Sequence, residues 1–197
     1  MQKIIVATKN EGKVKEIKAL LYGCGFDIKS LKDEGIDLEI EETGSTFEEN
    51  SLIKARAIHN LTGDIVIADD SGLEIDFLNG DPGIHSARFM ADLPYTERNK
   101  RIIELLKDVP EERRTARFRC VASLVSKSIE KTYTGTIEGR IAYEAKGDYG
   151  FGYDPIFFVP EYNLTLAQID PEIKNQISHR SRAFRLLAQD IKKMEIL

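Results

Sequence analysis

The chain has 197 residues, 42% hydrophobic and 31% charged, with a net charge of −5, which fits a soluble globular protein and argues against a general nucleic-acid binder. It contains no apolar run long enough to span a membrane and no signal-peptide pattern, so we expect a cytoplasmic protein. Two isolated cysteines and three scattered histidines offer neither a disulfide framework nor a zinc site, so any metal should be a hard cation bound by oxygen.

The chain opens with a predicted strand, a polar loop and a helix. Residues 3–7 are β-rich, residues 8–13 are polar, and apolar side chains at helical spacing predict a helix over about 13–22. Such a layout binds phosphate, because free N–H groups and the helix dipole converge at the helix N-terminus. The loop lacks the Walker A pattern, and a solvated loop with ordinary surface lysines is the alternative.

A second strand over 26–31 and a second helix are predicted next. Glu39, Glu41 and Glu42 form an acidic cluster, and Ser45 with Glu48 matches a capping box that opens a helix to about residue 61. On that helix Asn50 and Lys54 share a face with apolar residues. They are therefore expected to look into a cleft, although the edge of a solvent-facing helix would give the same pattern.

The segment from Ile65 to Leu73 is the centre of the predicted site. Residues 65–68 read as a buried strand that runs into Asp69, Asp70, Ser71 and Gly72. Adjacent side chains on a strand point to opposite faces, so one aspartate can face a cleft while the other braces the structure. Carboxylate oxygens suit Mg²⁺, and an ionised aspartate can accept a proton from water. The alternative is a simple turn, since Asp, Ser and Gly all form turns.

Shorter elements are predicted after this segment. They are a hairpin-like strand over 73–78, a turn over 79–83, a loop over 84–89, a helix capped by Thr96 and ending near residue 107, and an antiparallel pair over 113–126 and 131–137. The sequence shows no internal repeat and no linker. We therefore expect a single domain over residues 1–197.

Two further stretches carry candidate ligand contacts. In residues 146–155 glycines alternate with aromatics, a pattern that allows close backbone approach and base stacking, or else a tight turn whose rings pack into the core. Ser178 is a predicted N-cap that places His179 and Arg180 in the first turn of the last helix. Cations are unfavourable there, which points to an anionic or carbonyl-bearing ligand, or to solvent, that offsets the cost.

Several segments together resemble the inosine triphosphate pyrophosphatase family, whose members hydrolyse non-standard purine nucleoside triphosphates. They occur in family order over nearly the whole chain. They are Ala7–Lys13, Glu41–Gly44, Phe47–Asn50 with Lys54-Ala55, Ala68–Leu73, Pro82–Ile84, Ser86–Arg88, Gly150–Pro155 and Ile177–Arg180.

The resemblance implies an α/β fold with an elongated, mixed, twisted sheet flanked by helices, two lobes with a central cleft, and a homodimer. It also implies residue roles. Thr8, Lys9, Asn10, Glu11, Gly12 and Lys13 would hold the triphosphate, Glu41 and Asp70 would coordinate Mg²⁺, and Lys54 would position phosphate. Ser71 would contact the substrate, Phe151, Gly152, Tyr153 and Asp154 would bind the nucleoside with Phe151 stacked on the base, and Lys174, His179 and Arg180 would complete the base and phosphate contacts.

The expected activity is hydrolysis of ITP, dITP and XTP to the monophosphate and pyrophosphate, with Asp70, Lys54 and Lys13 as catalytic residues. The resemblance alone places the attack on the α-phosphorus. His179 and Arg180 can donate hydrogen bonds to a 6-keto purine, whereas adenine presents an amino group. No nucleic-acid polymer or membrane is expected as a partner. The alternatives are a nucleotide-binding sensor without catalysis and a pyrophosphatase for modified pyrimidine nucleotides.

Overall fold

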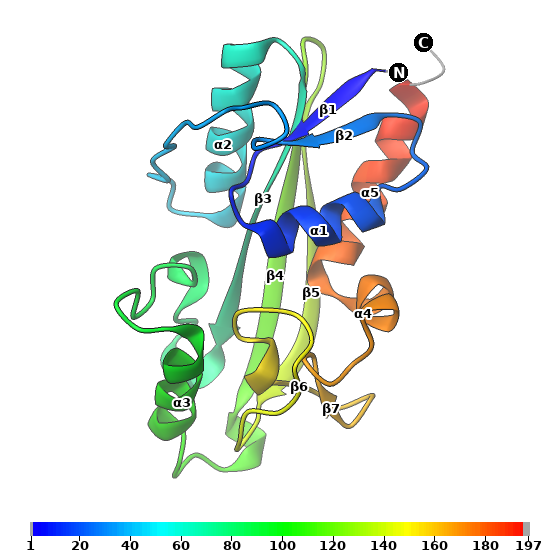
Figure 1. The fold of residues 1–197 in the computed structure, drawn as a ribbon. Coiled ribbons are helices and arrows are strands. Elements are labelled where there is room, and N and C mark those ends of the chain that lie inside the picture. Colours follow the sequence, from blue (N-terminus) through cyan, green and yellow to red (C-terminus); the bar gives the residue numbers. More distant parts are fainter. Residues whose placement is uncertain (1, 195–197) are drawn as a thin grey trace. The chain divides into compact units, whose positions relative to one another are not determined.

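The computed structural model describes residues 2–194, which form a mixed sheet of seven strands with helices around it (Figure 1). The strands lie in the order β2-β1-β3-β4-β5-β6-β7. β1 runs parallel to β2 and β3, and β6 runs antiparallel to β5 and β7. The elements are β1 (Lys3–Val6), α1 (Glu11–Leu20), β2 (Asp27–Ser30), α2 (Phe47–Thr62), β3 (Ile65–Ile75), α3 (Tyr95–Leu105), β4 (Thr115–Val125), β5 (Glu130–Ile141), β6 (Phe157–Val159), β7 (Leu164–Thr165), α4 (Pro171–Ile177) and α5 (His179–Met194). The predicted α/β class is confirmed.

The chain divides into two compact units. Unit 1 comprises Met1–Asp70, Cys120–Gly135 and His179–Leu197, and unit 2 comprises Ser71–Arg119 and Thr136–Ser178. β3, β4 and β5 each contribute residues to both units. A single domain and a central cleft both stay predictions.

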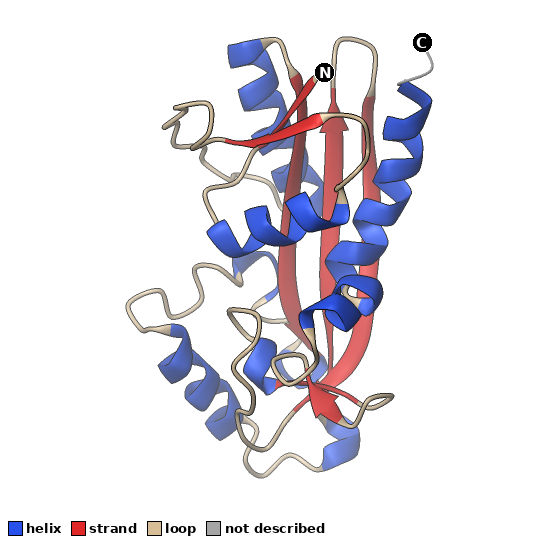
Figure 2. Ribbon diagram, turned by 45° about the vertical axis from the view of Figure 1, so that its right-hand side comes forward, coloured by secondary structure: helices blue, strands red, loops and turns tan. Residues whose placement is uncertain are grey.

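In unit 1, Ile4–Val6 of β1 and Ile65–Ala68 of β3 are buried on both faces, because each segment is an uninterrupted apolar run. Ile4, Val6 and Ile67 pack with residues of α1 and α5, while Ile5, Val66 and Ala68 pack with residues of α2. Figure 2 shows α1 and α5 crossing in front of the red strands of this unit. The apolar stripe predicted on the last helix belongs to the first of these two clusters.

Both cysteines are part of the same packing. Cys24 is 5% exposed and Cys120 is fully buried, and both belong to the cluster that α1 and α5 cover. They carry no disulfide, as the sequence predicted.

Unit 2 has a core of its own. Leu73 and Ile75 from the end of β3 pack with Ile102 of α3 and with Phe157 of β6. Tyr153 of the aromatic-glycine segment is also buried in this cluster. Part of that segment therefore serves the core, as the alternative reading of 146–155 proposed.

The predicted separate strand over 73–78 is wrong, and so is the alternative of a turn at Asp69–Gly72. β3 continues without a turn from Ile65 to Ile75, and no separate strand begins at Leu73. The turn propensity of Asp, Ser and Gly is overridden, because Asp69 and Asp70 find buried cationic partners on opposite faces of the strand.

Three helix starts differ from prediction. α1 begins at Glu11, two residues early, because the Asn10 side chain caps it. The cap of α2 is Thr46 rather than Ser45, with Glu49 rather than Glu48 bonding back to the Ser45 N–H. α3 begins at Tyr95 after Pro94, so Thr96 lies inside the helix and caps nothing.

One helix was not predicted at all. Asp170 caps α4 and Pro171 occupies its first turn, which is the favoured pairing at a helix start. No helix within residues 2–194 has the length and apolar character needed to cross a membrane.

Candidate active site

The loop predicted to hold phosphate is fixed by its own side chains. Thr8 Oγ1 accepts a hydrogen bond from the Asn10 N–H at 3.2 Å, and Asn10 Oδ1 accepts one from the Lys13 N–H at 3.0 Å. These bonds turn the chain from β1 into α1 and leave the lysines of the loop pointing in different directions. Lys9 is exposed, whereas only 14% of the Lys13 side chain is exposed.

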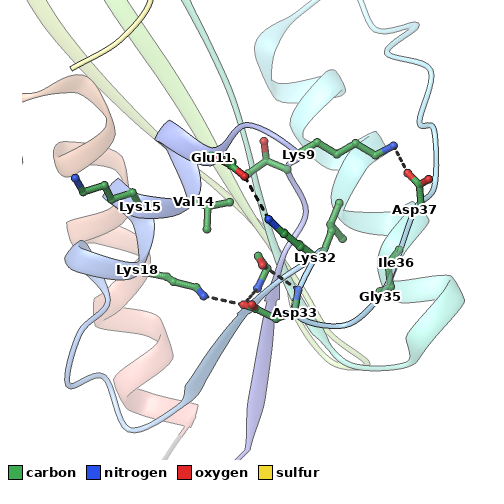
Figure 3. A pocket seen from close by; sticks show the side chains of 13 residues that line it. Lys9, Glu11, Val14, Lys15, Lys18, Lys32, Asp33, Gly35, Ile36 and Asp37 are labelled. Atoms are coloured by element: carbon green, nitrogen blue, oxygen red, sulfur yellow. Dashed lines mark hydrogen bonds and ion pairs between the residues drawn. The ribbon is translucent and has the colours of Figure 1, made fainter. Parts of the chain in front are cut away.

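A cavity of about 600 Å³ lies beside this loop within unit 1 (Figure 3). It is bounded by the segments 8–18 and 30–37. Ion pairs link the two segments, among them Lys9 Nζ with Asp37 Oδ1 at 2.7 Å and Lys32 with Glu11 at 3.6 Å. Thr8, Lys9 and Glu11, all predicted phosphate contacts, line this cavity.

Asp70 lies at the centre of a second group in unit 1. α2 brings Lys54 and Asn50 to it from the helix face that the two residues share. Lys54 Nζ donates to Asp70 Oδ1 at 3.1 Å, and Asn50 Nδ2 donates to Asp70 Oδ2 at 3.4 Å. The side chain of Asp70 is 8% exposed and that of Lys54 is 12% exposed. The pair is therefore largely shielded from water.

Glu42, and not Glu41, joins this group. Glu42 Oε1 accepts from Lys54 Nζ at 2.6 Å, while Glu41 is exposed. The segment that carries both acids is tied to α2 at Gly44, whose N–H donates to Asn50 Oδ1 at 2.8 Å. A Cβ at Gly44 would lie 2.6 Å from Glu49 Cβ, so only glycine allows this close approach to α2.

Charge and burial act against each other at Asp70. Burial raises the pKa of Asp70 above its ordinary value, and the nearby Glu42 adds to that rise, whereas Lys54 and Lys13 oppose it. Burial alone would lower the pKa of Lys54, but Asp70, Asp69 and Glu42 outweigh it and raise that pKa. Lys54 is therefore held as a cation among carboxylates, and Asp70 is a stronger base than an exposed aspartate.

Asp69 belongs to a separate buried ion cluster of unit 1. Its Oδ2 lies 3.0 Å from Lys13 Nζ and accepts hydrogen bonds from Arg180 Nε at 3.3 Å and Nη2 at 3.2 Å. Arg180 Nη1 also donates to Glu16 Oε2. Burial alone would lower the pKa of Arg180, but Asp69 and Glu16 raise it. The protein's own carboxylates thus offset the charge of Arg180 at the start of α5.

His179 is also buried at that helix start, with 4% exposed. A Cβ at Gly135 would lie 2.2 Å from the His179 carbonyl oxygen and 2.5 Å from the Ala183 nitrogen. The first turn of α5 therefore lies directly on the backbone of β5. This contact fixes the position of the helix start that carries His179 and Arg180.

In unit 2 an ion pair holds the segment predicted to bind the nucleoside, residues 151–154 (the nucleoside loop). Lys174 Nζ lies 2.7 Å from Asp154 Oδ2, with only 4% and 5% of these side chains exposed. The same Asp154 oxygen accepts from the Phe151 N–H at 2.8 Å. Lys174 Nζ is also 5.2 Å from the centroid of the half-buried Phe151 ring. Lys174 and Asp154 thus hold Phe151 in place.

Tyr153 has a structural position in this loop. It is 3% exposed, its hydroxyl donates to the Ser86 carbonyl oxygen at 2.8 Å, and its ring packs edge-on against Tyr95 with centroids 5.2 Å apart. Ser71, the remaining predicted substrate contact, is the first residue of unit 2.

Three contributors to these clusters were not predicted as site residues. Asn50 was placed on the correct helix face, and Glu42 was part of the acidic cluster, but no pattern distinguished Glu42 from Glu41. Glu16 gave no signal, since its partner Arg180 is 164 residues away. Residues 2–194 contain no group of three or more His, Cys, Asp or Glu side chains that could hold a metal without further ligands.

Comparison with known proteins places the chain in a family. The sequence pattern of the Ham1 family matches residues 4–190. A dITP/XTP pyrophosphatase of Bacillus licheniformis is 49% identical over 190 residues, covering 95% of this chain and 97% of that protein. A HAM1 protein from Coxiella burnetii has a solved structure with a TM-score of 0.88 and 38% identity, covering 98% of this chain and 100% of that one. The Ham1 protein of Staphylococcus aureus gives a TM-score of 0.86 and 37% identity, covering 98% and 100% of the two chains. The chain belongs to the Ham1 family.

Proposed function

We propose that this chain is a nucleoside triphosphate pyrophosphatase that hydrolyses dITP, XTP and ITP to the monophosphate and pyrophosphate. The observation that carries the proposal is Asp70, a buried carboxylate held between the amide of Asn50 and the ammonium of Lys54. The names of close relatives support the substrate class. The sensor and pyrimidine alternatives are not favoured.

The residues of unit 1 divide the work of the reaction. Asp70 orients a water molecule and accepts its proton, because its raised pKa makes it a better base than an exposed aspartate. Lys54 and Lys13 stabilise the negative charge that grows on the transferring phosphoryl group. The N–H groups at the start of α1 bind phosphate oxygens, and Asn10 and Thr8 fix that turn.

A divalent cation, for which we propose Mg²⁺, fits this arrangement. Asp70 and Glu42 both accept from the Lys54 ammonium and offer the hard oxygen ligands that Mg²⁺ prefers. The exposed Glu41, which the sequence predicted as the second ligand, is the neighbour of Glu42 in the chain. Mg²⁺ commonly uses one or two carboxylates together with substrate phosphates, so a cage of three protein ligands is not required. When bound, the cation would neutralise phosphate charge and act as a Lewis acid.

In unit 2, Phe151 stacks on the purine, and the Lys174 ammonium beside its ring donates to a 6-keto oxygen. Adenine presents an amino group at that position and is disfavoured. His179 and Arg180 begin α5. The Arg180 guanidinium is bound by the carboxylates of Asp69 and Glu16, so contact with the base is not its sole role. A homodimer stays a prediction that light scattering in solution tests.

A substrate panel tests the proposal. We expect ITP, XTP and dITP to be hydrolysed on the order of 10⁴-fold more efficiently than ATP, by kcat/KM, with pyrophosphate as the product. GTP shares the keto oxygen and should be discriminated less strongly. Stoichiometric binding of ITP without turnover would favour the sensor, and release of orthophosphate would overturn the site of attack. Hydrolysis that continues after exhaustive chelation would refute the requirement for a divalent cation.

A further inference from the structure

Asn99, a residue of α3 outside every predicted site, holds the nucleoside loop by one buried hydrogen bond. Its Nδ2 donates to the Gly152 carbonyl oxygen at 3.1 Å, and the residue is 3% exposed. Its Oδ1 accepts no hydrogen bond from the residues that the structure describes. Both residues lie in unit 2.

A buried side-chain amide whose nitrogen donates but whose oxygen accepts no hydrogen bond contributes little to stability. A buried acceptor without a donor costs free energy, and a leucine of nearly the same shape would remove that cost. A residue kept for packing would therefore gain by losing its polar atoms. This contrast indicates that the bond to Gly152 serves something other than the stability of the fold.

The bond acts on the peptide group next to the stacking ring. Gly152 has φ of +66°, in the left-handed region that favours glycine, and follows Phe151 directly. The Phe151 N–H is held by Asp154, and the Tyr153 hydroxyl by Ser86. Neither of these bonds fixes the direction of the Gly152 carbonyl, which Asn99 holds.

The helix that carries Asn99 is anchored firmly enough to serve as a reference. Arg98, one residue earlier, donates to the carbonyl oxygens of Leu93 at 2.7 Å and Ala87 at 2.9 Å. The ring of Tyr95, at the helix start, packs against Tyr153. The start of α3 is thus tied both to its preceding loop and to the nucleoside loop.

We infer that Asn99 is a positioning residue that sets the orientation of the Phe151 ring for a purine base by holding the Gly152 peptide. This role rests on the proposed function, in which Phe151 stacks on the base. It makes α3 a determinant of base affinity, although the phosphate-binding residues lie in unit 1. Loss of the bond should therefore weaken binding of the base and leave binding of phosphate unchanged.

The test compares the Asn99→Leu variant with the parent protein and with Lys100→Ala, an exposed neighbour on the same helix. We expect Asn99→Leu to raise KM for ITP about tenfold, with a smaller change in kcat and an unchanged inhibition constant for pyrophosphate. Its Tm should equal or exceed that of the parent. Amide hydrogen exchange should accelerate in residues 151–154 only, and Lys100→Ala should match the parent throughout.

An unchanged KM together with unchanged exchange in Asn99→Leu would overturn the inference. So would a lower Tm with faster exchange across all of unit 2, because that pattern marks a general structural role. Asn99→Ala, which removes the donor without adding bulk, repeats the test if the leucine variant does not fold. The exchange measurement needs no substrate, so a parent protein that fails to hydrolyse ITP would refute the proposed function while exchange still decides the role of Asn99.

Discussion

Asp69 and Asp70 are consecutive residues of β3, yet different lysines hold their carboxylates. Asp69 Oδ2 lies 3.0 Å from Lys13 Nζ, and Asp70 Oδ1 lies 3.1 Å from Lys54 Nζ. Because successive side chains of a strand point to opposite faces, the two acids belong to separate clusters. Asp69 also accepts a hydrogen bond from Arg180, and Asp70 accepts one from Asn50. This division predicts opposite consequences for two neighbouring substitutions.

Asp70→Asn should abolish turnover while the fold survives. Asparagine keeps the shape but cannot accept a proton, and loss of the general base costs on the order of 10²–10⁴-fold in kcat. Burial raises the pKa of Asp70, so its ionised form costs stability above that pKa, and a neutral amide should not lower Tm at neutral pH. Steady-state kinetics with a thermal melt measure both, and near-normal activity would refute the assignment.

Asp69→Asn should instead destabilise the protein. The substitution removes the carboxylate that balances Arg180 and Lys13 in a fully buried position, and breaking such a pair costs about 3–5 kcal/mol. Urea denaturation measures this free energy of unfolding. Asp37→Asn, at the exposed partner of Lys9, is the control and should change little. Equal effects at the two positions would contradict the assignment of Asp69 to a buried cluster.

The pH at which kcat/KM falls on acidification, the acid limb of the pH profile, should depend on the charged neighbours of Asp70. The raised pKa of Asp70 means that kcat/KM falls on acidification at a pH above the ordinary range of aspartate. Glu42→Gln removes a charge that raises this pKa and should move the limb to lower pH. Lys54→Met removes a charge that lowers it and should move the limb to higher pH, while Glu41→Gln should leave it in place. Profiles at saturating Mg²⁺ provide the comparison, and shifts of the opposite sign would refute it.

Phe151→Ala should raise KM more than it lowers kcat. Stacking of a base on an aromatic ring is worth about 1–3 kcal/mol, and the side chain is only half buried, so little of the core depends on it. Kinetics with ITP and a thermal melt separate the two effects. A large drop in Tm with unchanged KM would show that Phe151 serves the core, as Tyr153 does.

The elements that depend on local pattern could be read from the sequence. β1 and the apolar stripe of α5 follow from local pattern, and so does the shared face of Asn50 and Lys54 on α2, although the contact of both with Asp70 was not predicted. The continuity of β3 could not be read, because local turn propensity was overridden by partners as distant as Arg180, 111 residues away.

The finer composition of the site depends on the same kind of distant contact. Glu41 and Glu42 are equivalent in any local pattern, and only the contact with Lys54 of the distant helix α2 distinguishes Glu42. The start of α5 was predicted, but the pairing of Arg180 with Glu16 was not. Charge compensation within a fold joins residues that no spacing rule connects.

Both cysteines lie in the hydrophobic cluster of unit 1 that α1 and α5 cover, and the sequence contains no others. The rate at which a thiol reagent labels Cys24 and Cys120 therefore reports the opening of unit 1, separately from unit 2. A ligand that binds the phosphate loop, such as pyrophosphate, should slow this labelling. A ligand that contacts only the nucleoside loop of unit 2, such as the free nucleoside, should leave the rate unchanged. The native chain thus carries its own chemical reporter of which unit a ligand stabilises.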